Sequence, residues 1–124
     1  MLAWLEELEK ELLKYQTTVK FSENSLSDFK SYGTHTKKVI LALILSQAKR
    51  GAQFRPDGNG IRLSGELYGF AKIKRTNTSL RIIYRPVENG AIEMQILAIG
   101  PRDRNKVYEI AKKRQNTFLR EFDQ

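Results

Sequence analysis

The sequence predicts one α+β domain: an antiparallel sheet of about four strands with an N-terminal helical pair on one side, a C-terminal helix and an extra N-terminal helix. Three observations lead to this prediction. Apolar residues recur at helical spacing in the first half of the chain and at its end, but alternate with polar residues over much of residues 70–99. Glycine-containing turn signals separate these stretches. A length of 124 residues suits a single hydrophobic core.

The chain begins with a predicted amphipathic helix over residues 2–15 and a predicted strand over residues 16–21. In the first segment, leucines and Tyr15 recur every three or four residues, with glutamates on the opposite side. The second segment is rich in β-branched residues and alternates, as a half-buried strand does.

Two further helices are predicted next. Ser22 is a candidate N-cap for the first of them, and Gly33 interrupts the chain before the second. Thr34 or Thr36 is expected to cap the second helix, and Gly51 stands where a C-cap glycine belongs. Since so few residues join the two helices, they should form an antiparallel pair.

A meander of three strands is predicted over residues 70–74, 80–87 and 91–99. The Asn89-Gly90 pair predicts the hairpin between the last two strands. The closing helix is predicted to run from Asp103 to about Phe122. Its inward-facing residues are expected to be Val107, Ile110, Ala111 and Phe118.

The basic charge of the chain is the first indication of a partner. The formal net charge is +8. Residues 1–15 hold four glutamates and two lysines, a net charge of −2, so the remainder carries +10. A body this basic favours a polyanionic partner, with nucleic acid the leading candidate and a merely solvated basic surface the alternative.

The composition excludes several kinds of site. The sequence has no cysteine and a single histidine, His35, which excludes disulfides, thiolate chemistry and a multi-histidine metal centre. No acidic residues have the spacing of a carboxylate metal site, so we expect neither a metal nor another cofactor. No apolar run reaches about 18 residues and nothing marks export, so we expect a cytoplasmic protein without a membrane partner.

Five side chains suited to acid–base and phosphate chemistry fall on neighbouring predicted elements. Lys72 and Lys74 share one face of a strand, and Arg81 lies on the next strand. Arg102 follows the third strand, and Tyr108 lies six residues later on the closing helix. In an antiparallel meander these residues can converge on one sheet face. The four cations there could hold a phosphodiester and stabilise the charge that builds up during its cleavage.

These segments resemble the RelE family of toxin–antitoxin ribonucleases over roughly residues 17–115. The resemblance rests on an ordered set of short motifs: Leu63-Ser64-Gly65, Lys72-Ile73-Lys74, Arg81-Ile82-Ile83-Tyr84, Gly100-Pro101-Arg102 and Val107-Tyr108. Members of the family are small basic α+β proteins that bind the ribosomal decoding site and cut messenger RNA there. Because they commonly begin near the first strand, the resemblance divides this chain into a helical extension, residues 1–15, and a RelE-like toxin domain, residues 16–124.

The resemblance also implies a role for each of the five residues. Lys72 and Lys74 would lie near the reactive 2′-hydroxyl and the phosphate, one of them helping to deprotonate the hydroxyl. Arg81 would bind the scissile phosphate and stabilise its extra charge. Arg102 would lie by the leaving 5′-oxygen as acid or charge stabiliser, and Tyr108 would orient the nucleotide near the 2′-hydroxyl. The implied partners are an acidic antitoxin protein and messenger RNA in the ribosomal decoding site.

Elementary chemistry is compatible with such a site. RNA carries its own nucleophile, so cleavage needs alignment, a proton acceptor and positive charge rather than a metal-bound water. A free lysine is a poor base near neutral pH because its pKa is about 10.4. Crowding by other cations lowers that pKa, and two lysines and two arginines would provide the crowding here.

Other basic residues are candidates for contacts with the RNA backbone, with a solvated surface as the alternative: Arg75, Arg104, Lys106, Lys112 and Lys113. Tyr84 is expected to pack in the core or to anchor through its hydroxyl. Two other functions stay open. One is a non-enzymatic inhibitor of DNA gyrase of the related ParE type, and the other is a basic nucleic-acid-binding module.

Overall fold

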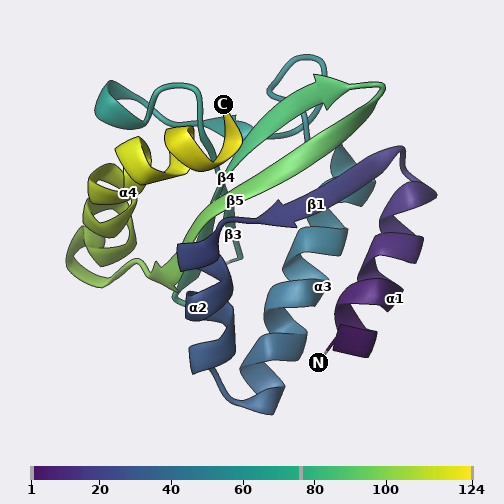
Figure 1. Ribbon diagram of the computed structural model, residues 1–124, viewed down its shortest axis with the longest axis horizontal. Coiled ribbons are helices and arrows are strands. Elements are labelled where there is room, and N and C mark those ends of the chain that lie inside the picture. Colours follow the sequence, from purple (N-terminus) through teal and green to yellow (C-terminus); the bar gives the residue numbers. More distant parts are fainter. Residues whose placement is uncertain (1, 76, 124) are drawn as a thin grey trace.

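The computed structural model describes residues 2–75 and 77–123, which form four helices and five strands (Figure 1). In chain order they are α1 Leu2–Leu13, β1 Thr17–Phe21, α2 Glu23–Ser31, α3 Thr34–Arg50, β2 Ile61–Arg62, β3 Ala71–Lys74, β4 Leu80–Asn89, β5 Ala91–Pro101 and α4 Lys106–Phe122. Two short 3₁₀ turns, η1 Gly65–Leu67 and η2 Asp103–Asn105, precede β3 and α4. The predicted α+β class is confirmed.

The strands form one mixed sheet in the order β1-β5-β4-β3-β2. The strands from β2 to β5 pair antiparallel, whereas β1 lies parallel to β5 at one edge. The prediction of an antiparallel sheet of about four strands is therefore wrong in two details. The parallel pair joins segments far apart in the sequence, and β2 has only two residues, so neither feature leaves a local pattern.

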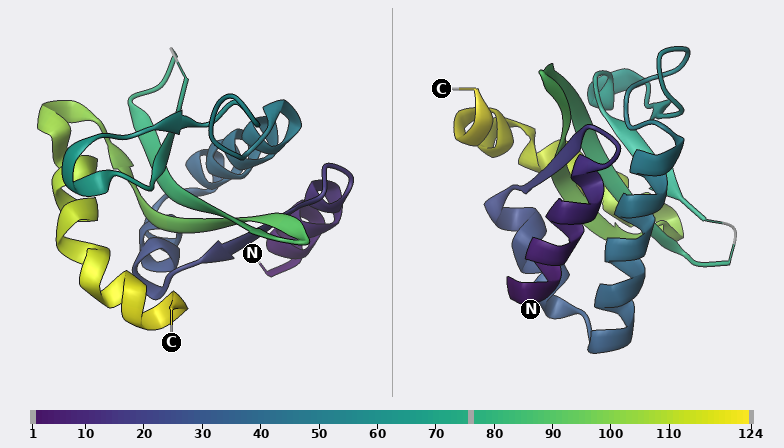
Figure 2. Two further views of the ribbon diagram at one scale, coloured as in Figure 1. Left: turned by 90° about the horizontal axis from the view of Figure 1, so that it is seen from above. Right: turned by 90° about the vertical axis from the view of Figure 1, so that its right-hand side faces the viewer.

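Helices cover both faces of the sheet (Figure 2). The helices α1, α2 and α3 share the larger core with the sheet, in which Leu12, Phe29 and Ile44 are fully buried. On the other face, α4 packs through residues that include Val107 and Phe118. Burying each large apolar side chain contributes about 1.5–3 kcal/mol, so both faces contribute to holding the sheet.

The helix ends follow from local chemistry. Ser22 Oγ accepts a hydrogen bond from Ser25 N at 3.1 Å, which confirms the predicted N-cap of α2. The predicted C-cap of α3 is also confirmed, because Gly51 has a φ of 107° that glycine adopts easily. The predicted threonine cap of α3 is wrong: Gly33 is the N-cap, and Thr34 is already helical. The helices α2 and α3 run antiparallel, as predicted (Figure 1).

The helix α1 takes part in the larger core, since Leu8 and Leu12 are buried there. The helix α1 also contacts α3, because Lys38 Nζ of α3 lies 5.6 Å from the centre of the Trp4 ring. The helix ends at Leu13, two residues earlier than predicted. The division of the chain into an extension, residues 1–15, and a toxin domain, residues 16–124, stays a prediction.

Candidate active site

The five residues that the sequence singles out for chemistry line one hollow of about 320 Å³ on the α4 side of the sheet. The lining residues are Leu63, Lys72, Lys74, Arg81, Arg102, Asn105 and Tyr108. The structure thus brings all five candidates together, while their chemical roles stay predictions.

The strand register explains why the cations meet. Lys74 lies directly opposite Arg81 in the β3–β4 pair, and opposite residues point to the same face of a sheet. Ile73, between the two lysines, points the other way and is buried in the larger core. The position opposite Arg81 on β5 is Gly100, so β5 places no side chain beside this arginine.

Arg81 is the most deeply placed of the four cations, with an exposed fraction of 8%. Its Nη1 donates to Leu80 O at 2.7 Å and to Thr78 O at 3.1 Å, which fixes the guanidinium. Within residues 2–75 and 77–123, its Nε and Nη2 donate no hydrogen bond. These groups are therefore available to a phosphate oxygen, the acceptor that a guanidinium suits best.

The segment after β5 places Arg102 and Asn105 at the hollow. Arg102 N donates to Ser79 O at 2.9 Å and so ties the end of β5 to the start of β4. Asn105 N donates to Arg102 O at 2.8 Å, which closes a tight turn between the strand and α4. Tyr108, in the first turn of α4, then reaches the same hollow.

Two predictions about the closing helix are wrong. Arg104 and Asn105 have φ values of 52° and 58°, so the helix does not run from Asp103 as predicted. Instead α4 begins at Lys106. Ile110 was predicted to face inward, but its exposed fraction is 40%, whereas the other three predicted positions are buried.

The pKa of Lys72 is lowered in the hollow. Burial is the largest cause, followed by the positive charges of Lys74 and Arg81. The predicted direction is confirmed, although burial outweighs the crowding on which the prediction rests. A lower pKa increases the share of neutral amine, the form that can accept a proton.

None of the five residues predicted to contact the RNA backbone lines this hollow: Arg75, Arg104, Lys106, Lys112 and Lys113. Arg104 and Lys106 are exposed in the turn beside the hollow. Lys112 Nζ pairs with Glu109 Oε2 at 3.0 Å, and this bond raises the pKa of Lys112. Arg75 lines a separate hollow. Contacts of these residues with RNA stay a prediction.

Sequence reasoning placed two lining residues, Leu63 and Asn105, outside the site, although Leu63 belongs to one of the motifs behind the resemblance. Leu63 N donates to Phe70 O at 2.9 Å, which holds the segment after β2 against the start of β3. That pairing leaves no signal in a two-residue strand. Asn105 carries a usable signal, because asparagine tolerates a positive φ better than most residues and so favours a break in a helix.

Tyr84 belongs to the core, as predicted. The side chain is fully buried, and its hydroxyl donates to Ala52 O at 2.8 Å. Burial raises the pKa of Tyr84 well above its usual value, which keeps the phenol neutral.

Two features are absent from residues 2–75 and 77–123. No group of three histidine, cysteine or acidic side chains there could hold a metal ion. No helix in the same ranges is long and apolar enough to cross a membrane.

Solved structures share this architecture. A variant of the E. coli toxin RelE in the free state, with two arginines changed to alanine, matches with a TM-score of 0.57 and 19% identity over 77% of this chain and 94% of that one. The isolated E. coli RelE toxin matches with a TM-score of 0.53 and 20% identity over 78% and 96% of the two chains.

The toxin–antitoxin complex RelBE2 from Mycobacterium tuberculosis matches over 68% of this chain and 96% of that one, with 26% identity and a TM-score of 0.46. No protein-family model and no curated protein sequence matches the chain. The two E. coli matches confirm the architecture that the sequence resemblance implies: the chain has the fold of the RelE toxins.

Proposed function

We propose that this protein is the toxin of a toxin–antitoxin pair, and that it cuts messenger RNA on the ribosome in the cytoplasm without a metal ion. The observation that carries the proposal is the hollow itself. It combines a lysine with a lowered pKa, further cations and a tyrosine, all of them residues that the sequence had singled out. The fold of the RelE toxins agrees with this function.

The proposed reaction uses the 2′-hydroxyl of the RNA as nucleophile. The neutral amine of Lys72 accepts the hydroxyl proton as the O2′–P bond forms. The free N–H groups of Arg81, together with Lys74, stabilise the negative charge on the phosphoryl oxygens. The P–O5′ bond then breaks, and Arg102 stabilises the leaving oxygen while it takes a proton from water; the protonated Lys72 returns its proton to the solvent. The products are a 2′,3′-cyclic phosphate and a 5′-hydroxyl end.

The proposed role of the ribosome is to align the RNA in the hollow. Lysine is a weak base even with a lowered pKa, so the rate depends strongly on how well the RNA is aligned. A decoding site that holds the message in a fixed path would provide this alignment. An acidic antitoxin would find the same basic surface by charge, since the chain carries a net charge of +8.

The test is cleavage of a defined message on purified ribosomes. The wild-type protein should produce fragments with 5′-hydroxyl ends, and a 2′-deoxynucleotide at the cut position should abolish that cut. The variant Arg102→Ala should be slow, whereas Arg120→Ala, at an exposed position on α4, should cut normally. An intact message combined with inhibition of DNA gyrase would contradict the proposal and favour the ParE-type function. RNA binding without cleavage would favour a simple binding module.

A further inference from the structure

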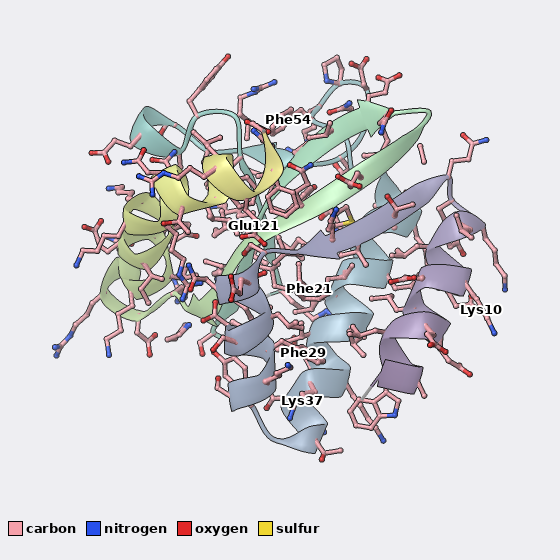
Figure 3. The ribbon with its side chains drawn as sticks, in the orientation of Figure 1. Lys10, Phe21, Phe29, Lys37, Phe54 and Glu121 are labelled. Carbon is pink, nitrogen blue, oxygen red and sulfur yellow. The ribbon has the colours of Figure 1, made fainter. Side chains whose placement is uncertain are left out.

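A second group of residues suited to nucleic acid lies outside the hollow. Phe54, Arg62 and Tyr68 form a cation–π stack, with the guanidinium carbon of Arg62 3.7 Å from the centre of the Phe54 ring and 4.9 Å from that of Tyr68. Phe54 follows α3, Arg62 ends β2 and Tyr68 follows η1. Figure 3 shows Phe54 at the upper end of the molecule, well away from Lys37 at the far end of α3.

Tyr68, the exposed tyrosine of this stack, is held in place by its neighbours. Leu67 and Phe70, on either side of Tyr68, are buried with exposed fractions of 3% and 4%. The backbone between them is fixed by a bond from Phe70 N to Leu67 O at 3.0 Å. Gln115 of α4 also donates its side-chain amide to Glu66 O at 2.6 Å. Tyr68 thus sits on an anchored turn and not on a free loop.

Although its backbone is anchored, the Tyr68 side chain is 68% exposed, so most of its surface faces solvent. Both aromatic rings lie close to the Arg62 guanidinium, whose N–H donors lie around the edge of its plane. In the part of the chain that the structure describes, the Arg62 side chain forms neither an ion pair nor a hydrogen bond, unlike those of Arg55, Arg85 and Arg114. The stack therefore offers an open aromatic face and an open row of donors.

The stack and the hollow lie on the two sides of one edge strand. β2 is the last strand of the sheet, and Arg62 pairs with Ala71, whose side chain points into the larger core. Leu63, the next residue, lines the hollow. A single strand of RNA that leaves the hollow across this edge would reach the stack next.

We propose that this stack is a nucleotide subsite for single-stranded RNA, in which a base stacks on Tyr68 and the neighbouring phosphate binds the edge of Arg62. The subsite rests on the proposed function, because it takes the RNA that enters the hollow. Aromatic rings and guanidinium planes are the groups on which proteins stack unpaired bases. An acidic protein would need the charge of Arg62 but not the open ring of Tyr68.

Binding of an RNA that cannot be cut tests the subsite in the full-length protein. The probe is a labelled single-stranded RNA with 2′-O-methyl groups throughout, and affinity is measured by fluorescence anisotropy. Tyr68→Ala should weaken binding about 10-fold, while Tyr68→Phe retains it. Arg62→Lys keeps the charge but loses the planar group, and it should bind less well than wild type. The matched control is Tyr15→Ala, which removes a tyrosine with an exposed fraction of 40% elsewhere.

An abasic scan locates the base. Each nucleotide of the RNA is replaced in turn by an abasic residue, and wild type is compared with Tyr68→Ala. At one position the loss from the abasic residue and the loss from Tyr68→Ala should not add, because both remove the same contact. Thermal unfolding of Tyr68→Ala should match wild type.

Several results would overturn the subsite: no binding of the RNA by wild type, unchanged affinity of Tyr68→Ala, equal losses from Tyr15→Ala, or additive losses at every position. If Tyr68→Ala weakens binding of an acidic protein partner but not of the RNA, the stack is a protein contact, and the proposed subsite is wrong. The readout is independent of cleavage. If the message stays intact on ribosomes but the abasic scan shows non-additive losses, the ribonuclease function is wrong and the subsite is right. If the message is cut but the losses are additive at every position, the subsite is wrong and the ribonuclease function is right.

Discussion

Two groups of cations on the α4 side of the sheet differ in whether they meet an acid. Arg114 Nη1 lies 2.6 Å from Asp28 Oδ2, and Arg85 Nη2 lies 2.7 Å from Asp123 Oδ1. Within residues 2–75 and 77–123, none of the four cations of the hollow has a carboxylate within 4.0 Å. The paired arginines thus hold the fold together, while the unpaired cations are left to bind something else.

The Arg114 pair shows what a structural cation does. Asp28 of α2 accepts two hydrogen bonds from this guanidinium and a third, at 3.0 Å, from Ile99 N of β5. Arg114 also donates to Leu97 O at 3.3 Å. The pairing of β1 with β5 stops at Ile96. The ion pair therefore takes over the hydrogen bonds of β5 where its neighbouring strand ends.

The largest effect is expected for Arg81→Ala, which removes the most deeply placed cation of the hollow. Cleavage on programmed ribosomes should slow by about 10²- to 10³-fold, the usual loss for one donor to a developing charge. The free energy of unfolding should fall by no more than about 1 kcal/mol, because the lost bonds to two carbonyls are partly offset by less repulsion. A folded Arg81→Ala protein with full activity would show that this unpaired cation has no part in cleavage.

A pH profile sharpens the role of Lys72. Below its lowered pKa the amine is protonated and cannot accept a proton, so the cleavage rate should fall about tenfold per pH unit as the pH decreases. Lys72→Ala should remove this limb of the profile, whereas Lys49→Ala, at an exposed position on α3, should keep it. The same rising limb in Lys72→Ala would show that another group is the base.

The lowered pKa of Lys72 also makes the free energy of unfolding depend on pH. Because the pKa of Lys72 is lower in the folded state than in the unfolded state, the protonated amine destabilises the fold. This penalty is complete below the folded pKa and disappears as the pH rises towards the unfolded pKa of about 10.4. Lys72→Met should therefore raise the melting temperature at neutral pH and lose that advantage at higher pH. A constant advantage at all pH values would contradict the assignment.

For a paired cation we expect a loss of stability without a loss of cleavage activity. Arg114→Ala should reduce the free energy of unfolding by about 1–3 kcal/mol, because it leaves the half-buried Asp28 carboxylate without its charged partner. Urea unfolding measures this loss. Cleavage per folded molecule should stay unchanged, so a selective loss of activity would remove the distinction between the two groups.

The smallest effect is expected for Asp123→Asn. The carboxylate is 46% exposed, so the pair with Arg85 should contribute about 0.2–1 kcal/mol at neutral pH. The hydrogen bond from Arg85 lowers the pKa of Asp123 below 3.8. This contribution is thus present above that pH and is lost as the pH falls through the lowered pKa. Wild type and Asp123→Asn should unfold alike in urea at pH values below the lowered pKa.

Features that depend on neighbouring residues could be predicted from the sequence. Periodicity and turn chemistry gave the four helices and four of the five strands. Alternation along the segments that form β3 and β4 predicted that Lys72, Lys74 and Arg81 share one face, and the strand register agrees. The position of Gly51 as a helix C-cap followed from its type alone.

Features that join distant segments could not be predicted. The Asp28–Arg114 pair spans 86 positions, and the parallel pairing of β1 with β5 also joins segments far apart in the chain. The stack around Arg62 needs a loop, an edge strand and a turn at once. Local patterns say nothing of such contacts, because they arise only when the tertiary fold brings the segments together.

The ion pair at the end of β5 has a consequence beyond stability. A strand with unpaired amides and carbonyls is a template on which another chain can add, and this is a common route to self-association. Asp28 and Arg114 occupy the groups that β1 leaves open at Ile99 and Leu97. Loss of either side chain would expose a short stretch of apolar sheet edge. Such variants should form oligomers and precipitate on storage, a change that turbidity records separately from the loss of stability.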